Sequence, residues 1–522
     1  MRAIRRELRS FGLIAVLGAF AWCALSGRTL LAQSVTTTAI RGSLRTPDGG
    51  RIDGARVRVV NIATGFAVET AAREGRFLVL GLEVGGPYTI TARRLGFLPQ
   101  ERGPLFLTLG EPLELVFTLQ PAAVPLDTVR VVNSSIPSRG HTHGGTGITL
   151  SDSLVHRLPT LNRDLYDFVR LVPQISTRIR LPQGGLPASP AGHVSGGGVG
   201  FRFNNYLING APERFVSGNS SLATLGGKSV PLEAVKEYQV LLAPYDVRYG
   251  DFAGALVNTV TRSGTNELRG SVFAYSRSDR LARGGELAPG APYERFQYGF
   301  SLGGPILRDR LHFFVAPELQ RLTSPAEGPY LGQPSTATRE VPVSAPDLAS
   351  FDSIMTNKYG LAAGSPGPVQ TENPLTNVFA RLDLAIPEWN TRAVIWGNYI
   401  RTANSSLSRA APDTFSLSSY KLTATFESRM TALQLHTALR RAGGGHNELL
   451  VSYRPAGSRP TSPVTQPLVL VAVPSAGGGT VLLNSGTHLF AQGMFDRSWT
   501  INVKEILTLP FGVDHVVTLG LE

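Results

Sequence analysis

The chain has few of the features that mark disulfide-stabilised domains, helical membrane proteins and helical enzymes. Its 522 residues include a single cysteine, Cys23, which lies in an apolar stretch near the N-terminus. No apolar run in the body of the chain reaches the roughly 18 to 20 residues that a spanning helix needs. Charged residues make up only 17% of the chain, whereas it holds 57 glycines and 36 prolines. This composition favours many strands joined by turns.

Lysine is also scarce, with five residues, so 50 − 5 = 45 of the basic residues are arginine and the net charge is +12. The arginines are scattered and do not form a basic face with interleaved aromatics, which argues against nucleic-acid binding. GC-rich codon use explains them, or they line an aqueous lumen or meet anionic lipid headgroups.

Known catalytic and nucleotide-binding motifs are missing as well. HExxH and GxSxG do not occur. Gly226–Ser229 resembles the end of a phosphate-binding loop, but Leu222 stands where its first glycine should be. His141 and His143 lie in a linker, where we expect them to be solvated. We therefore expect no enzyme, no cofactor, no metal site and no nucleic-acid partner.

Residues 1–32 have the pattern of an export signal. Four arginines stand within the first nine residues, Phe11–Leu25 is apolar, and Ala32 offers a small residue for cleavage. The alternative is an uncleaved anchor helix. Trp22 precedes Cys23, where a lipoprotein signal would have a small residue. Removal of the signal would leave a mature chain without cysteine, which therefore needs no disulfides.

Residues 37–120 are expected to form a small β-sandwich. Short alternating strands recur every 8 to 12 residues with turn signals between them. The strands expected are Ile40–Leu44, Ala55–Val60, Gly75–Val79, Tyr88–Ala92 and Leu113–Leu119.

Residues 121–147 are expected to be a linker rich in Pro, Gly and Ser with one β-prone run inside it. Such a run suits pairing with the edge of a partner's sheet. Alternatively, the run is the last strand of the sandwich or the first strand of the next domain. It consists of Leu126, Asp127, Thr128, Val129, Arg130, Val131 and Val132.

Residues 148–263 are expected to form a small α+β domain with long irregular loops. One helix would start at Asp152 or Ser153, and another would end near Leu171. A third is expected over Pro231–Tyr238, because Leu232, Val235 and Tyr238 share one helical face. Gln239–Leu242 and Ala255–Thr261 are expected to be strands.

Residues 264–522 are expected to form the first part of a transmembrane antiparallel β-barrel, with about ten strands present. The alternating runs approach the 9 to 11 residues of a tilted spanning strand. Long polar loops, Gln320–Asn373 and Arg454–Gly493, alternate with short turns, which disfavours the alternative of a soluble sandwich or propeller. The chain stops within an apparent strand, so we expect it to be the front of a longer protein. Aromatics expected to form interfacial girdles are Phe273, Tyr275, Phe296, Tyr298, Phe300, Phe313 and Phe314.

Particular segments resemble known families. Residues 37–120, with Asp48-Gly49, Gly75–Phe77 and Gly86–Tyr88, resemble the carboxypeptidase-regulatory-like domain, a transthyretin/Ig-like, carbohydrate-binding-like fold. The rest resembles a TonB-dependent outer-membrane receptor of the Oar-like branch. The segments that carry this second resemblance are Phe203–Gly210, Pro231–Gln239, Tyr245–Gly250, Val257–Asn266, Phe300–Ile306, Asp309–Phe314 and His515–Glu522. Asn209-Gly210 departs from the family's usual Asp-Gly.

The second resemblance implies a barrel of 22 strands around a plug domain, in the cell outer membrane. A periplasmic partner, the C-terminal domain of TonB, would pair with Leu126–Val132, the candidate TonB box, although Val129–Val132 departs from the family's Val-rich box. An unidentified solute would then enter past the plug. Gly184–Val199 and Gly210–Gly227 would face that solute. The candidate solute contacts from the plug are Arg178, Arg180, Arg202, Asn204, Asn205 and Asn209. The alternative for the three arginines, and the one we favour, is that they bond to the barrel wall. The alternative function is an adhesion or surface-assembly protein that uses the same shell without import.

Overall fold

The computed structural model describes most of the chain, and all that follows concerns those residues. They are 36–109, 112–122, 129–132, 146–160, 162–178, 193–199, 203–213, 228–242, 250–281, 293–333, 339–407, 409, 413–439, 444–493, 496–511 and 515–522. The expected signal (1–32), Leu126–Thr128, Arg180, Arg202, His141 and His143 lie outside them. None of the helices in the described part has the length and apolar character to cross a membrane.

The first unit is a β-sandwich. One sheet has the order β4-β1-β7 and the other β3-β2-β5-β6-β8. Alternate side chains from both sheets meet in a core that includes Ile40, Leu44, Ile90 and Phe117, as period-2 patterning requires. Its strands are β1 (Thr37–Arg45), β2 (Arg56–Asn61), β3 (Ala67–Ala71), β4 (Arg76–Glu83), β5 (Gly85–Arg93), β6 (Gln100–Leu107), β7 (Leu113–Thr118) and β8 (Val129–Val132).

The second unit is the expected small α+β domain, called the plug below. Its main sheet has the order β13-β12-β15-β14-β9, with β10 and β11 paired separately. Its elements are β9 (Thr146–Leu150), α2 (Asp152–Arg157), α3 (Leu165–Val169), β10 (Ile175–Arg178), β11 (His193–Gly196), β12 (Asn205–Ile208), β13 (Ala211–Pro212), η3 (Leu232–Ala234), β14 (Val235–Leu242) and β15 (Ala255–Thr261).

The prediction of a helix over Pro231–Tyr238 is wrong. Only the single turn η3 is helical, and Val235 already begins β14. β14 lies between β15 and β9, and nearly all of its residues are buried. A strand covered on both faces does not need to alternate between apolar and polar residues, so its apolar residues can also fit a helical period, and here the sheet environment decides.

The third unit is a single large antiparallel sheet that forms the barrel wall. Its path is β16-β17-β18-β20-β21-β23-β24-β27-β28, with β19 paired to β18, so the sheet is open between β16 and β28. The strands are β16 (Arg269–Ser278), β17 (Glu294–Leu307), β18 (Leu311–Pro325), β19 (Gln370–Glu372), β20 (Leu375–Ile386), β21 (Thr391–Ser406), β23 (Leu422–Leu439), β24 (Gly445–Thr461), β27 (Asp496–Phe511) and β28 (His515–Leu521). Short helical turns are η4 (Asp279–Leu281) and η6 (Pro387–Trp389).

The outer face of the wall is largely apolar, and its inner face carries buried charged and amide groups beside the apolar residues that pack on the plug. On β20 the inward Asn377, Arg381 and Asp383 are buried, whereas the outward Leu382 and Leu384 are exposed. Charged and amide groups turned inward with apolar side chains turned outward are the reverse of a soluble sandwich and typical of a wall that faces lipid. This finding confirms the predicted mainly-β fold class of sandwich, plug and outer-membrane barrel.

The predicted aromatic girdle is only partly correct. Phe296, Tyr298 and Phe300 lie exposed on the outer face, as expected. Tyr275 is exposed too, but it has the same inward phase on β16 as Phe273, and its ring packs beside that of Phe273. Phe273 and Phe314 instead point inward and are buried, because each falls on the inward phase of its strand's alternation.

The two long loops were predicted to begin too early. Gln320 lies inside β18 and Arg454 inside β24, so both strands extend beyond the apolar run. Residues of these two loops and of the connection between β21 and β23 form a small apolar cluster around Phe351, Phe415 and Leu483. Its elements are α4 (Ala345–Ser353), η5 (Ile354–Lys358), β22 (Thr414–Ser416), η7 (Ser418–Tyr420), β25 (Val469–Pro474), β26 (Thr480–Ser485) and η8 (Leu489–Ala491).

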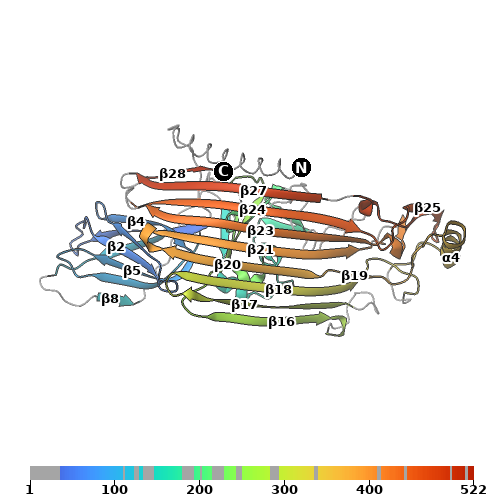
Figure 1. Ribbon diagram of the computed structural model, residues 1–522, viewed down its shortest axis with the longest axis horizontal. Helices are drawn as coiled ribbons and strands as arrows, with labels where there is room; N and C mark the ends of the chain where they lie inside the picture. The colour runs from blue at the N-terminus through green and yellow to red at the C-terminus, as the bar shows by residue number, and fades with distance from the viewer. Residues whose placement is uncertain are drawn as a thin grey trace, which may run out of the picture.

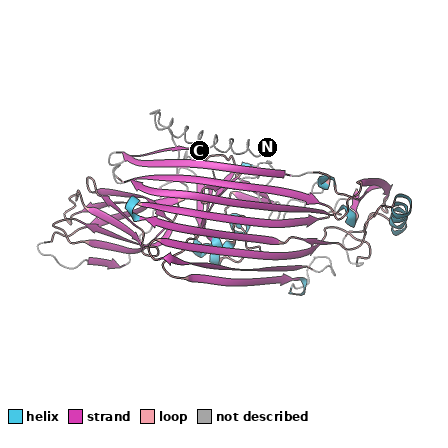
Figure 2. Ribbon diagram, in the orientation of Figure 1, coloured by secondary structure: helices cyan, strands magenta, loops and turns pink. Residues whose placement is uncertain are grey.

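The sandwich lies beyond one end of the wall strands, and the plug lies against one face of the wall (Figure 1). The sandwich lies at the end where short turns join the wall strands, and α4 and β25 lie at the opposite, long-loop end (Figure 1). In the part of the chain that the structure describes, the helices are short (Figure 2). The plug and the inner wall share one apolar core, which joins Tyr238 and Val257 of the plug to Phe379 and Trp396 of the wall.

Candidate functional site

The described half of the candidate TonB box is a strand of the sandwich. β8 pairs in parallel with β6, in a register that places Val129 opposite Gln100 and Val132 opposite Gly103. β8 is the last strand of its sheet, beyond β6. The structure thus gives this run the place of a last sandwich strand, one of the two alternatives left open by the sequence. Its role as a TonB box stays a prediction.

The plug is bonded to the wall by buried polar groups. Lys228 Nζ forms an ion pair with Glu318 on β18, and the side chains of both residues are almost fully buried (6% and 0% exposed). Asn377 Nδ2 donates to the carbonyl oxygen of Lys228 at 3.0 Å, and Asn398 Nδ2 donates to that of Ser229 at 2.6 Å. These contacts hold the segment that leads into η3 against three neighbouring wall strands.

A second attachment lies near α3. Arg163 forms an ion pair with Glu233 at 2.9 Å, within the plug. Its guanidinium also stacks over Phe273 and Tyr275 of β16, at 4.2 and 4.7 Å from the ring centres. The pair and the stacking together tie the plug to the first wall strand.

The sandwich, the plug and the wall meet in one ion network. Glu83, at the end of β4, pairs with Arg381 at 3.0 Å and with Arg392, while Arg381 also pairs with Asp383 at 2.7 Å. Arg381 Nη1 donates to the carbonyl oxygen of the plug residue Thr261 at 3.1 Å. One buried guanidinium therefore contacts all three units.

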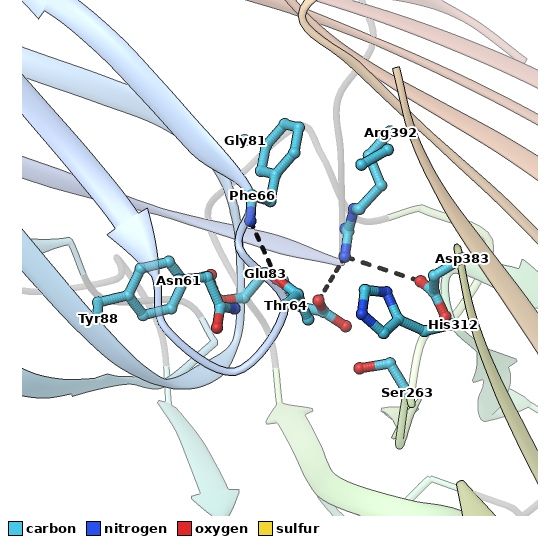
Figure 3. Close-up of a pocket in the computed structure, with 11 residues that line it drawn as sticks. Asn61, Thr64, Phe66, Gly81, Glu83, Tyr88, Ser263, His312, Asp383 and Arg392 are labelled. Carbon is cyan, nitrogen blue, oxygen red and sulfur yellow. Dashed lines mark hydrogen bonds and ion pairs between the residues drawn. The ribbon is translucent and has the colours of Figure 1, made fainter. Parts of the chain in front are cut away.

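Glu83 is ionised in this network. Burial alone would raise the pKa of its carboxyl, but the nearby cations outweigh that effect and hold the pKa below its ordinary value; they are Arg392, Lys236 and Arg381. The network borders a small pocket at the junction, which also receives Tyr88 and His312 (Figure 3). The charged groups Glu83, Asp383 and Arg392 that line this pocket are already in ion pairs. We therefore interpret it as part of the interface between the units.

Glu237 gives the junction a predicted pH dependence. Its Oε1 accepts a hydrogen bond from the backbone N–H of Leu109 in the sandwich at 3.0 Å, and burial raises its pKa to about 7. The folded protein then binds more protons than the unfolded chain between pH 4.5 and 7, so this group's contribution to stability is lost as pH rises through that window. Glu237→Gln keeps the acceptor and removes the charge.

We therefore expect Glu237→Gln to stabilise the protein at pH 8, by at most about 3 kcal/mol, and to change little at pH 4.5. Urea unfolding of wild type and variant at both pH values measures the difference. An equal effect at the two values would show that Glu237 titrates normally.

The predicted solute-facing asparagines bond within the plug. Asn204 Oδ1 accepts from the Ala255 N–H at 2.8 Å, and the Asn209 side chain bonds twice to Thr261, at 2.9 Å each. Asn205 Nδ2 donates to Gly250 at 3.4 Å. The structure brings the three together on and beside β12. Arg178 is the last residue of β10, which belongs to the separate two-stranded sheet and not to the sheet that holds β12. Contact with a solute stays a prediction for all of them.

Sequence reasoning missed the buried ionic groups, among them Glu83, Arg381 and Lys228. Each was hidden in an ordinary strand or loop. For Arg381 a signal existed, because an arginine at an inward position of an alternating strand must find a partner.

Comparison with known proteins gives two family matches. A model described as "Outer membrane beta barrel domain" matches residues 260–414, and one described as "Carboxypeptidase regulatory-like domain" matches residues 39–120. The chain is 30% identical over 129 residues to the TonB-dependent transporter Oar of Myxococcus xanthus, covering 23% of this chain and 12% of Oar. It is 26% identical over 225 residues to PirA of Acinetobacter baumannii, described as a probable TonB-dependent siderophore receptor, covering 40% of this chain and 27% of PirA.

Solved structures give matches at lower identity. The siderophore receptor PirA from Acinetobacter baumannii matches with 17% identity and a TM-score of 0.44, over 72% of this chain and 47% of PirA. The outer membrane transporter YddB from Escherichia coli matches with 12% identity and a TM-score of 0.47, over 70% and 45%. The chain thus spans about half of each of these structures and less of the curated relatives.

Proposed function

Because the chain belongs to the TonB-dependent receptors of the outer membrane, we propose that it imports a solute through a plugged barrel energised by TonB. The observation that carries the proposal is the wall itself, with apolar residues outside, polar residues inside and a bonded plug on the inner face. Short turns mark the periplasmic end of such barrels, so the sandwich lies on the periplasmic side.

The contacts of the plug explain why import would need external energy. Separating Lys228 from Glu318 would leave buried charges without partners. Loss of the partner of one buried charge costs about 3–5 kcal/mol of stability. A mechanical pull on the plug from the periplasm would supply this energy.

The segment that TonB would engage is Leu126–Val132. Strand pairing needs a free backbone edge, and β8 ends its sheet among the described residues, so TonB either adds to its outer edge or takes the place of β6. Val131→Pro removes a backbone N–H from this run. We expect Val131→Pro to weaken binding of the purified TonB C-terminal domain at least tenfold, measured by titration against the full-length protein in detergent.

Val131→Ala is the matched control, because it shortens the side chain and keeps the N–H. We expect it to bind TonB within about threefold of wild type. Equal binding by the proline variant, or no TonB binding by wild type at high concentration, would rule out this segment as the TonB box.

A ferric chelate is the first solute class to test, because one curated relative carries a siderophore receptor's name. The test is uptake of radiolabelled iron from a panel of chelates by cells that express the full-length gene and lack their own receptors, with and without TonB. TonB-dependent uptake of one chelate supports import of this class. Growth on peptides or glycans without iron uptake would point to another solute.

The adhesion or surface-assembly alternative draws on one observation, that the described half of the box lies in the sandwich sheet instead of standing free. Deletion of residues 126–132 separates the two functions. Import predicts loss of uptake with normal fractionation to the outer membrane and a normal heat-dependent gel shift. Adhesion predicts that cell attachment survives the deletion unchanged.

A further inference from the structure

Two histidines and a glutamate meet inside the wall, close to the sandwich. His436 lies on β23 directly opposite Glu448 on β24, and His446 precedes Glu448 by two residues, so all three point inward. Each is buried, with 4%, 2% and 4% of its surface exposed for His436, Glu448 and His446. Their candidate ligand atoms all lie within 4.8 Å of one another.

The geometry within this cluster is close to that of a metal site. His436 Nδ1 lies 3.5 Å from Glu448 Oε2, and the two imidazole rings stack with centres 5.9 Å apart. Ligands about 2.0–2.2 Å from a tetrahedral ion stand about 3.3–3.6 Å apart. The distance between His436 Nδ1 and Glu448 Oε2 therefore already suits two ligands of one ion. Rotation of the His446 ring would bring its nitrogen to the same distance from both.

The histidine nitrogens are otherwise unexplained. His436 Nδ1 and His446 Nε2 are buried and have no hydrogen-bond partner in the part of the chain that the structure describes. Burial of a polar atom without a partner costs about 1–3 kcal/mol, so such atoms commonly point to a missing ion or water.

The surroundings complete the site. The Thr36 hydroxyl, just before β1, donates to Glu448 Oε1 at 3.0 Å, which fixes the carboxylate with Oε2 toward His436. The ring of His446 lies against Gly81 of β4, where an added Cβ would stand 2.2 Å from it. Arg392, the cation nearby, is paired with Glu83.

We propose that His436, His446 and Glu448 bind a divalent transition-metal ion of the zinc class. Two imidazoles and one carboxylate are a common zinc set, with the fourth position left for water. No local motif indicates this site, because the histidines stand ten residues apart and meet only through pairing of β23 with β24. Since Thr36 and Gly81 belong to the sandwich, the ion would also strengthen its contact with the wall. This proposal does not depend on import or on TonB.

The test uses the full-length protein in detergent, stripped with a chelator and titrated with Zn²⁺ against a chromophoric competitor. We expect one equivalent to bind, and at least a tenfold loss of affinity in Glu448→Gln. The double variant His436→Gln/His446→Gln should lose the site entirely. The matched control is His312→Gln, an equally buried wall histidine outside the cluster, which should bind as wild type does.

Co²⁺ supplies a readout that does not depend on the variants folding. Bound to wild type, it should give the strong visible absorption of a four-coordinate site, and a heat-modifiable gel shift shows that the protein is folded. Folded wild type that takes up no Zn²⁺, or a double variant that binds it as tightly as wild type, would overturn the proposal.

Discussion

Arg381→Met is expected to lower the free energy of unfolding by about 3–5 kcal/mol, the cost of removing one partner from a buried ion network. The guanidinium is 5% exposed and holds two carboxylates, Glu83 and Asp383, at 3.0 and 2.7 Å. Methionine fills much of the same volume, so the loss reports on charge more than on packing. Without Arg381, the ion pair left to Asp383 is the 4.0 Å contact with Arg392, and Glu83 keeps Arg392 and the nearby Lys236.

Urea unfolding of the full-length protein, followed by tryptophan fluorescence, measures this loss. The matched control is Arg310→Met, which removes an arginine from an exposed turn pair with Glu388 and is expected to cost less than about 1 kcal/mol. Equal effects of the two substitutions would show that water reaches the junction and that the network does not join the three units.

The network also explains why the sequence predicted the units but not their junction. Alternation along β20 and β21 is a local signal, and it was sufficient to predict wall strands. The pair of Arg381 with Glu83 joins residues 298 positions apart. No pattern within either segment specifies the other, because the contact exists only once the sandwich lies at the short-turn end.

The errors have the same physical origin. Leu232, Val235 and Tyr238 fit a helical face and equally fit a strand buried on both sides, and only the neighbouring β15 and β9 decide between them. Strand ends were underestimated at Gln320 and Arg454 because inward residues of the wall are polar. For the candidate site, the sequence could indicate the β-prone run Leu126–Val132, because extended structure is a local property. The buried charges that hold the plug could be found only from the fold.

Lys228→Met and Glu318→Gln are each expected to loosen the plug, because each removes a charge from a buried pair. Lys228→Met leaves an unpaired carboxylate and Glu318→Gln an unpaired ammonium, both in the interior. Each single change should cost about 3–5 kcal/mol. The double variant Lys228→Met/Glu318→Met leaves no unpaired charge, so it should be more stable than either single variant.

The loss has a functional readout as well as a thermodynamic one. A plug loosened at Lys228 should leak, so cells that express either single variant should take up a large hydrophilic antibiotic faster than cells with wild type. The backbone contacts from Asn377 and Asn398 remain in all variants, which keeps the segment in place while the charge is changed. If the double variant proves no more stable than the singles, the pair contributes through its packing and hydrogen bond, and the plug is held by its shared apolar core with the wall.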